Sequence, residues 1–210
     1  MRWPALTRTK PLGLAVIFLV SLGGCVAPQY DDQTDKLISQ LQADVDTEFA
    51  TLISLDHKIA SLTKKAEALN QRISTLTAEN SAGAASDLAA AKNGLALAEK
   101  NLADAKTKAG YDANIAFYIK VDVSLVSLQT RIDAEPNLAT PRLDTAIAKL
   151  RDNLLADKGS LQAAHQLESG IIAEAQLRLM QQLIDAQLSS LLTYELQLKS
   201  GSGATGGAAK

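Results

Sequence analysis

Cysteine and histidine, which often serve as nucleophile, general base or metal ligand, are scarce in this sequence. The 210 residues include one cysteine, Cys25, and two histidines, His57 and His165. A metal site needs further ligands at helical spacing, and only the ordinary carboxylates Asp56 and Glu168 lie near the imidazoles in sequence. We therefore expect both histidines at solvated surface positions, with no metal ion.

Two other groupings resemble sites only superficially. Ser169-Gly170 places a serine beside a glycine, but the flanking sequence lacks the strand–turn–helix pattern of a nucleophile elbow. Asp31, Asp32 and Asp35 have the oxygen ligands of a cation site. Carboxylates in the opening turn of a helix are explained more simply by the positive end of the helix dipole.

The main concentration of aromatic residues comprises Tyr111, Phe117 and Tyr118. We expect these rings to pack in a core rather than to line a binding groove. The glycines are scattered without the spacing that cradles a phosphate. The sequence therefore predicts a protein that is not an enzyme, with no cofactor and no small-molecule substrate.

Charge and composition narrow the function classes further. Residues 1–24 contain three basic residues and no acidic one, so the rest of the chain has 18 Lys and Arg against 23 Asp and Glu, a net charge of −5. Such a body lacks the electrostatic footprint of a nucleic-acid-binding protein. Aromatic residues make up 4% of the chain, while Ala, Leu, Gln, Lys, Asp and Glu dominate. This composition is typical of an all-α fold.

The cysteine follows a segment with the order of an export signal. The first ten residues carry three basic side chains and no acidic one, and residues 12–22 are apolar apart from a glycine and a serine. These 11 residues would rise ~16 Å as a helix, against ~30 Å for the hydrocarbon core of a bilayer. The segment is therefore expected to be cleaved and not to span the membrane.

A four-residue motif ends this segment: Leu22, Gly23, Gly24 and Cys25. It resembles the lipobox of bacterial lipoproteins, in which an aliphatic residue and two small residues precede an invariant cysteine. The resemblance implies that residues 1–24 are a cleaved signal peptide and that Cys25 becomes the first residue, carrying a diacylglyceryl thioether and an acylated amine such as a palmitoyl amide. Residues 25–30 would then be a lipidated tether. The alternatives are an ordinary cleaved signal with an unrelated cysteine, or a buried free thiol.

The position after the cysteine bears on localisation. In the enterobacterial sorting pattern an aspartate there favours retention in the inner membrane, and this chain has Val26. The resemblance therefore favours a lipid anchor at the periplasmic face of the outer membrane. Several acyl chains would make such attachment effectively permanent.

Residues 31–80 carry apolar side chains at a seven-residue repeat. β-branched residues alternate with leucines at three- and four-residue spacing, which is typical of a coiled coil. The two rows are Ile38, Val45, Leu52, Ile59, Ala66 and Ile73, and Leu41, Leu55, Leu62, Leu69 and Leu76. Glu48 interrupts the second row, and we expect Phe49 beside it to take over the contact.

Residues 86–135 predict a second long helix, which returns along the first. Asn80 and Gly83 suit a left-handed cap and Ser86-Asp87 a new helix start, so we expect a tight hairpin between the two. Alanines and leucines again repeat every seven residues: Ala84, Ala91, Ala98 and Ala105, and Leu88, Leu95 and Leu102. Beyond a kink at Gly110, a wider apolar face is expected from these residues: Tyr111, Ile115, Phe117, Tyr118, Ile119, Val121, Leu125, Leu128 and Ile132.

Two shorter helices complete the prediction. One begins at Thr140-Pro141, with threonine as the cap, and has a soft spot at Gly159. The other follows a turn around Ser169-Gly170 and ends near Lys199. Its buried row is expected to be Ile172, Ala175, Leu179, Leu183, Leu188, Leu191, Tyr194 and Leu198.

Helix lengths then suggest the architecture. The two shorter helices, about 29 residues each, can cover only half of the long pair. The sequence thus predicts an up-down four-helix bundle within residues 31–199, from which an antiparallel coiled-coil hairpin projects at about 56–109. Residues 200–210, rich in glycine, serine and alanine, are expected to be a disordered tail.

Short segments of the body also resemble uncharacterised lipoproteins of proteobacteria: Tyr111-Asp112, Ala116-Phe117-Tyr118 with Leu125 and Leu128, and Leu192 to Leu196. This resemblance supplies no functional residue beyond Cys25.

Together the patterns predict a non-enzymatic, lipid-anchored periplasmic protein that acts as a spacer or recruits an envelope partner, or pairs with its own copies through the coiled coil. The alternative is an accessory subunit of an envelope transport or secretion complex that docks through the hairpin. A bundle that holds a lipid or haem is disfavoured, because no internal pair of histidines or methionines is evident.

Overall fold

The computed structural model describes residues 31–79, 82–134, 140–156, 158–167 and 170–205. These residues form helices, turns and short irregular segments without a strand, so the predicted all-α class is confirmed. The elements are α1 (Asp32–Glu79), α2 (Ala82–Ala109), α3 (Tyr111–Ala134), α4 (Pro141–Arg151), the π-helical turn η1 (Asp152–Ala156), α5 (Leu161–Gln166) and α6 (Glu174–Thr205). Several sequence predictions fall outside the described residues: the motif Leu22, Gly23, Gly24 and Cys25, the cap at Asn80, and the last residues of the tail, 206–210.

The beginning of α1 is fixed by its cap. Asp31 accepts from the backbone N–H groups of Gln33 (3.2 Å) and Thr34 (3.2 Å), which would otherwise lack partners. Arg131 of α3 donates to the same carboxylate through Nε (2.7 Å) and Nη2 (3.0 Å). This guanidinium holds the pKa of Asp31 well below its usual range. The prediction that acidic residues here serve the helix end is confirmed for Asp31.

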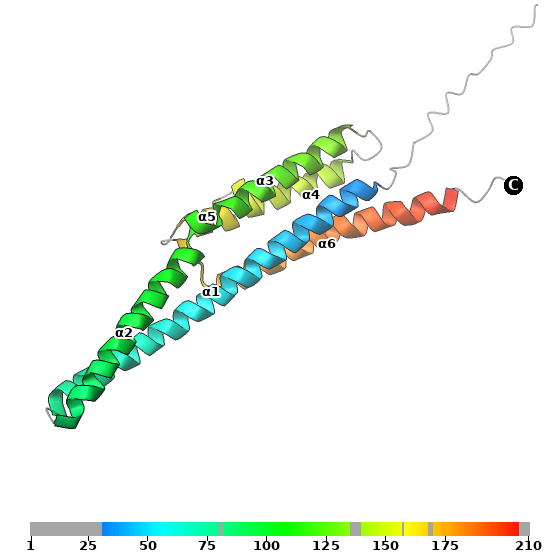
Figure 1. Ribbon diagram of the computed structural model, residues 1–210. Coiled ribbons are helices and arrows are strands. Elements are labelled where there is room, and N and C mark those ends of the chain that lie inside the picture. The colour runs from blue at the N-terminus through cyan, green and yellow to red at the C-terminus, as the bar shows by residue number, and fades with distance from the viewer. Residues whose placement is uncertain (1–30, 80–81, 135–139, 157, 168–169, 206–210) are drawn as a thin grey trace, which may run out of the picture.

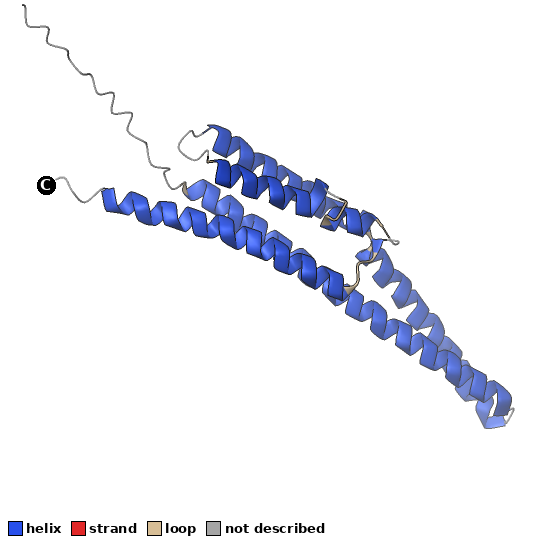
Figure 2. Ribbon diagram, turned by 180° about the vertical axis from the view of Figure 1, so that it is seen from behind, coloured by secondary structure: helices blue, strands red, loops and turns tan. Residues whose placement is uncertain are grey.

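α1 is the element against which the other three long helices, α2, α3 and α6, pack. Its 48 residues form one continuous helix, about 72 Å long. α3 and α6 lie along its first half and α2 along its second half, so that α1 and α2 extend away from the other helices (Figure 1, Figure 2). Ion pairs mark the alignment: Asp31 with Arg131, Asp44 with Lys120 (2.8 Å), and Arg72 with Asp87 (3.4 Å). From the first of these pairs to the last, the residue number increases along α1 and decreases in the helix that pairs with it.

The core is wide where several elements meet and narrow where only α1 and α2 do. Large buried side chains from α1, α3, α4 with η1, α5 and α6 form the wide part: Ile38, Leu41, Val45, Phe49, Leu52, Tyr118, Val121, Leu125, Leu128, Ile132, Leu143, Ile147, Leu150, Leu154, Leu161, Leu177, Ile184, Leu188 and Leu191. Between α1 and α2 the buried residues are small: Ala66, Ala84, Ala91, Ala98 and Ala105. The predicted alanine row is confirmed, as is the burial of Phe49 beside a half-buried Glu48.

The helix predicted from residue 140 onward is broken. α4 passes into the π-helical turn η1, and α5 begins only at Leu161, where Ser160 caps it by accepting from the N–H of Ala163 (3.1 Å). The predicted cap at Thr140 is confirmed, since its hydroxyl accepts from Leu143 (3.2 Å). The predicted soft spot at Gly159 is where the break lies. A glycine and a serine that favours the cap position together outweigh helix propagation here.

The predicted buried row of the last helix is confirmed at Ile172, Leu188 and Leu191, but the structure differs from it at two other leucines. Leu179 and Leu183 are 69% and 51% exposed, while Leu177 and Ile184 are buried. α6 contacts both α1 and α4, and the leucines of this segment form two stripes. The periodicity alone could not decide which stripe faces inward. α6 also continues through Thr205, into the segment predicted to be a disordered tail, because a helix that is already formed extends at little cost per residue.

The apolar face of α3 is narrower than predicted. Ile119 is 61% exposed and Ile115 40%, although α3 contacts α1, α2, α4, η1 and α5. The neighbouring elements therefore leave part of the predicted apolar face uncovered. Across the described helices, no stretch combines the length and hydropathy that crossing a bilayer requires.

Candidate functional site

A buried histidine joins three elements at the point where α2 gives way to α3. His165, on the short helix α5, is completely buried. Its Nε2 lies 2.7 Å from the carbonyl oxygen of Ala109, and its Nδ1 lies 2.7 Å from the hydroxyl of Tyr118. A carbonyl can only accept, so Nε2 donates to Ala109 and the Tyr118 hydroxyl donates to Nδ1. The prediction of a solvated His165 is wrong, because the break before α5 lets this helix turn the imidazole inward.

The aromatic residues predicted to pack in a core surround this imidazole. Tyr118 lies against Tyr111, Phe117 and His165, with ring centroids 5.5, 5.1 and 5.8 Å apart. Tyr118 is buried and the other two aromatic rings are half-buried, so core packing is confirmed for this cluster. Burial, and secondarily the charge of Glu48, raises the pKa of the Tyr118 hydroxyl. The hydroxyl is thus a fixed donor and not an acid that loses its proton.

Gly170 closes the same junction from the other side. Its φ is +76°, a left-handed conformation that glycine adopts without steric cost. A Cβ at this position would lie 2.7 Å from the backbone nitrogen of Tyr111 and 3.2 Å from the Cα of Gly110. The glycine next to Ser169 therefore serves close backbone packing, and Ser169 itself lies outside the described residues.

The other histidine lies where it was predicted, on the surface. His57 of α1 is exposed, and its Nε2 lies 2.6 Å from a carboxylate oxygen of Glu174. Asp56 accepts from the backbone N–H of Glu174 (3.1 Å), and Arg178 pairs with the same side chain (2.7 Å). His57, and then Arg178, lower the pKa of the Glu174 carboxyl. This cluster fastens the first turn of α6 to the middle of α1.

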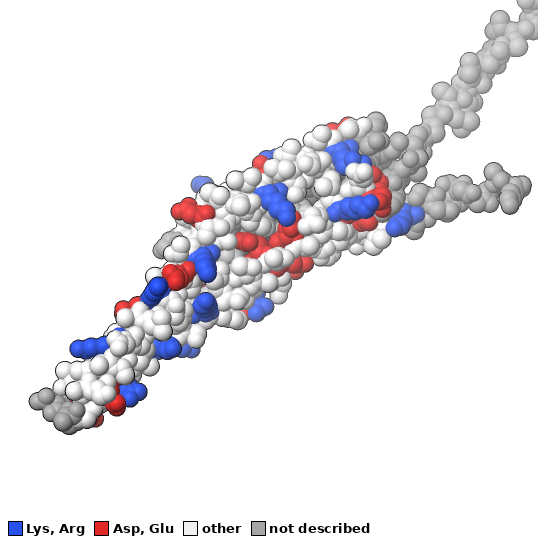
Figure 3. All heavy atoms as spheres, in the orientation of Figure 1, with Lys and Arg blue, Asp and Glu red and all other residues white. Residues whose placement is uncertain are grey.

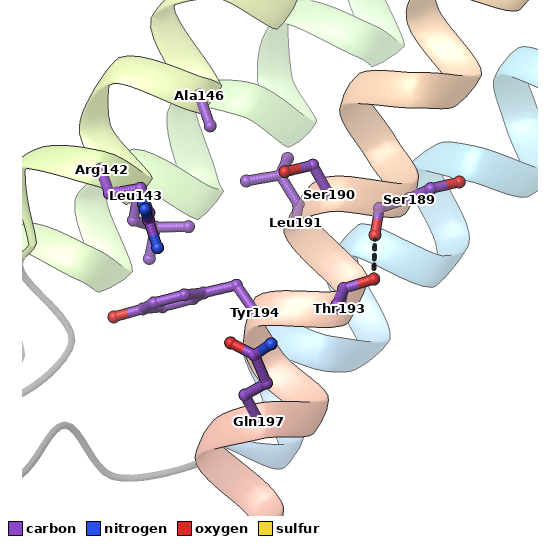
Figure 4. Close-up of a pocket in the computed structure, with 9 residues that line it drawn as sticks. All are labelled: Arg142, Leu143, Ala146, Ser189, Ser190, Leu191, Thr193, Tyr194 and Gln197. Atoms are coloured by element: carbon purple, nitrogen blue, oxygen red, sulfur yellow. Dashed lines mark hydrogen bonds between the residues drawn. The ribbon is translucent and has the colours of Figure 1, made fainter.

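A groove of about 460 Å³ separates α4 from α6 (Figure 4). Its lining residues are Arg142, Leu143, Ala146, Ser189, Ser190, Leu191, Thr193, Tyr194 and Gln197. The Tyr194 hydroxyl donates to Thr140 (3.2 Å), and that of Thr193 donates to the backbone of Ser189 (2.7 Å). No carboxylate, imidazole or thiol lines this groove. Its lining therefore offers no acid–base pair and no activated nucleophile.

Charged residues of both signs are interspersed along the visible face of the molecule (Figure 3). Among the described residues, no three His, Cys, Asp or Glu side chains are arranged to hold a metal ion.

The comparisons with known proteins found no matching family model and no significant match among curated proteins or solved structures.

Sequence reasoning missed two carboxyl groups on α6. Glu195 is completely buried, and both of its carboxyl oxygens lack a hydrogen-bond partner. Asp185 is half-buried with its Oδ1 also unpartnered. A signal was present, because Glu195 follows Leu188 by seven residues and Leu191 by four, and so continues an apolar row.

Proposed function

We propose that this chain is a non-enzymatic, lipid-anchored protein of the bacterial cell envelope, which presents a partner-binding surface at a distance from the membrane. The observation that carries the proposal is the continuity of α1 from Asp32 to Glu79. The proposed acylation site, Cys25, precedes one end of this helix by seven residues, and the turn into α2 lies at the other end (Figure 1). If α1 lies perpendicular to the bilayer, an anchor at Cys25 would thus hold the turn between α1 and α2, the tip of the hairpin, about 70 Å from the membrane.

The proposed architecture is an up-down four-helix bundle with a projecting antiparallel coiled-coil hairpin. In this arrangement α1, α3, α4 with α5, and α6 make the bundle, and the second half of α1 with α2 makes the hairpin. The ion pairs described above support the opposite chain directions, and the buried alanine row of α2 supports coiled-coil packing. The proposed location is the periplasmic face of the outer membrane.

The anchor has a direct test in cells that express the chain. Globomycin, which inhibits the lipoprotein signal peptidase, is expected to cause the uncleaved precursor to accumulate. Cys25→Ser is expected to abolish both cleavage and incorporation of labelled palmitate, because the thiol is the proposed acceptor of the diacylglyceryl group. Ser21→Ala, which leaves the four-residue motif intact, is the matched control and should be processed and labelled. A Cys25→Ser chain that is still cleaved and released as a soluble protein would refute the anchor.

The proposed spacer role predicts that the length of the hairpin matters. We call this hairpin, the second half of α1 with α2, the rod. Deleting residues 64–77 and 86–99 removes two heptads from each arm in matching register, keeps residues 78–85, and shortens the rod by about 21 Å. A photocrosslinker at the exposed Glu79 is expected to capture an envelope partner from the full rod but not from the shortened one. The bundle should stay folded and acylated, since the contacts of Asp56 and Ala109 with the rest of the chain are kept. Equal capture by both chains would argue against a spacer.

One observation favours the alternative of an accessory subunit that docks through the sides of the hairpin. Leu97 of α2 is 58% exposed, an apolar side chain on the outer face of the rod. In that case a crosslinker at residue 97, rather than at the tip, would capture a helical component of a transport or secretion channel. Leu97→Lys would then abolish co-purification with that component, whereas Lys92→Ala on the same helix would not.

A further inference from the structure

Carboxyl groups face one another along the contact between α1 and α6. Asp46 of α1 lies close enough to Asp185 of α6 to raise the pKa of that carboxyl, after the larger effect of its burial. Three turns further along α6, Glu195 is close to Asp31 and Asp35 at the beginning of α1. Helix contacts usually place opposite charges or apolar groups together, because like charges repel and a buried charge loses its hydration. This contact is thus unfavourable when every carboxyl is ionised.

Of these carboxyl groups, Glu195 is the most deeply buried, so its ionisation is the least favourable. Its side chain is completely buried, and neither carboxyl oxygen has a partner at hydrogen-bond distance and angle. Burial first, and then the charges of Asp31 and Asp35, raise its pKa from 4.5 to about 7, against a smaller opposing effect of the Asp31 backbone. Glu195 therefore takes up a proton far more readily in the folded protein than in the unfolded chain.

We propose that protonation of Glu195 and Asp185 controls the docking of α6 on α1, so that α6 is held firmly at mildly acidic pH and loosens as the pH rises through neutrality. A protonated carboxyl is neutral, which removes both the burial cost and the repulsion. It also gains an O–H that can donate to the opposite carboxylate, Asp46 or Asp35. The inference does not depend on the proposed envelope function.

The other charged groups around this contact do not reverse the direction. Asp31 stays ionised because Arg131 of α3 binds it with two hydrogen bonds, so the proton goes to Glu195. Lys199 lies one turn beyond Glu195 on α6, and Arg142 of α4 lines the groove on the other side of α6. At the opposite end of α6, His57 and Arg178 contact the carboxylate of Glu174 and lower its pKa, so this carboxyl does not share the raised pKa of Glu195 and Asp185.

The sign follows from the pKa of Glu195 in the two states. Because the folded pKa is the higher one, the folded chain binds more protons than the unfolded chain between about pH 4.5 and 7. Docking is therefore most favourable below about pH 4.5 and weakens progressively as the pH rises to about 7.

Hydrogen exchange of the full chain in detergent tests the proposal. Amides of Leu177–Leu191 are followed at about pH 5 and about pH 7.5, after correction for the intrinsic pH dependence of exchange. Protection of α6 is expected to be at least about tenfold higher at the lower pH. Residues 121–132 of α3 should change less, by the amount that the raised pKa of Glu48, near Tyr118 of α3, contributes. The double variant Glu195→Gln with Asp185→Asn should be strongly protected at both pH values.

Two controls separate this effect from a general loss of charge. Glu99→Gln with Asp104→Asn removes the same number of carboxylates from exposed positions of α2 and should keep the pH dependence of the native chain. Asp35→Asn with Asp46→Asn removes the opposing charges from α1 and should reduce it. The proposal is overturned if α6 protection is independent of pH or falls on acidification, or if the α6 double variant responds as the native chain does. Millimolar calcium restoring protection at the higher pH in the native chain alone would instead show a cation site.

Discussion

Gly170→Ala is expected to destabilise the protein by about 2–5 kcal/mol, one of the largest effects of any single methyl group in this chain. Two costs combine. A residue with a Cβ is strained at φ +76°, and the new methyl would lie 2.7 Å from the backbone nitrogen of Tyr111, an atom that no side-chain rotation can move away. Urea unfolding followed by far-ultraviolet circular dichroism would measure the loss as a lower midpoint.

Gly159→Ala is the matched control for this substitution. A methyl group at this position would meet no atom within 4 Å beyond its chain neighbours, and the φ of Gly159 lies outside the left-handed region. Alanine there should be neutral or stabilising by up to about 1 kcal/mol, because it restricts the unfolded chain more than the folded one. Equal destabilisation by the two substitutions would mean that Gly170 does not close the junction between α2 and α3.

The buried face of a helix could be predicted from the sequence wherever its apolar residues pointed to a single stripe. Along residues 38–52 the seven-residue rows are flanked by polar residues, so only one stripe can face a partner, and the structure buries that stripe. Along residues 84–105 the seven-residue repeat of alanines was the guide, and those alanines are buried. Helix starts were also predictable, because Asp31 and Thr140 accept hydrogen bonds from backbone N–H groups two or three residues later, which is a local property.

Prediction failed where a tertiary contact chose between equal local options. On α6 the stripes of Leu179 and Leu183, and of Leu177 and Ile184, are both apolar, and the packing of α6 against two helices selected the second. The helix break before Leu161 had a local signal in Gly159, but nothing local shows that the next helix turns inward. That turn decides the environment of His165, so its burial could not be derived from spacing.

The buried carboxyls show a different limit. Glu48 interrupts an apolar row, and its pKa is raised to about 7 by burial, much as for Glu195. Their positions in the rows are visible in the sequence. Whether such a carboxyl reaches water, a cation or nothing depends on the neighbouring helix, and here Glu195 meets other acidic groups. A polar residue in an apolar row is therefore a useful pointer to a pH-sensitive contact, but its partner has to come from the structure.

The two histidines make the second large prediction. His165→Leu is expected to cost about 2–5 kcal/mol, because it leaves the Tyr118 hydroxyl and the Ala109 carbonyl buried without partners, at about 1–3 kcal/mol each. His57→Leu is the matched control, since the same substitution on the surface breaks only the exposed pair with Glu174 and should cost much less. Urea unfolding at about pH 7 measures both.

A double-substitution cycle separates the hydrogen bond from the loss of packing. Tyr118→Phe alone removes the donor to Nδ1 and should also destabilise the protein, while keeping the aromatic ring. With His165→Leu in place the hydroxyl already lacks a partner, so removing it should restore part of the lost stability, and the two effects should not add. Strict additivity would show that Tyr118 and His165 are neighbours without a significant bond. The junction of α2 and α3 would then depend on Gly170 and on apolar packing alone.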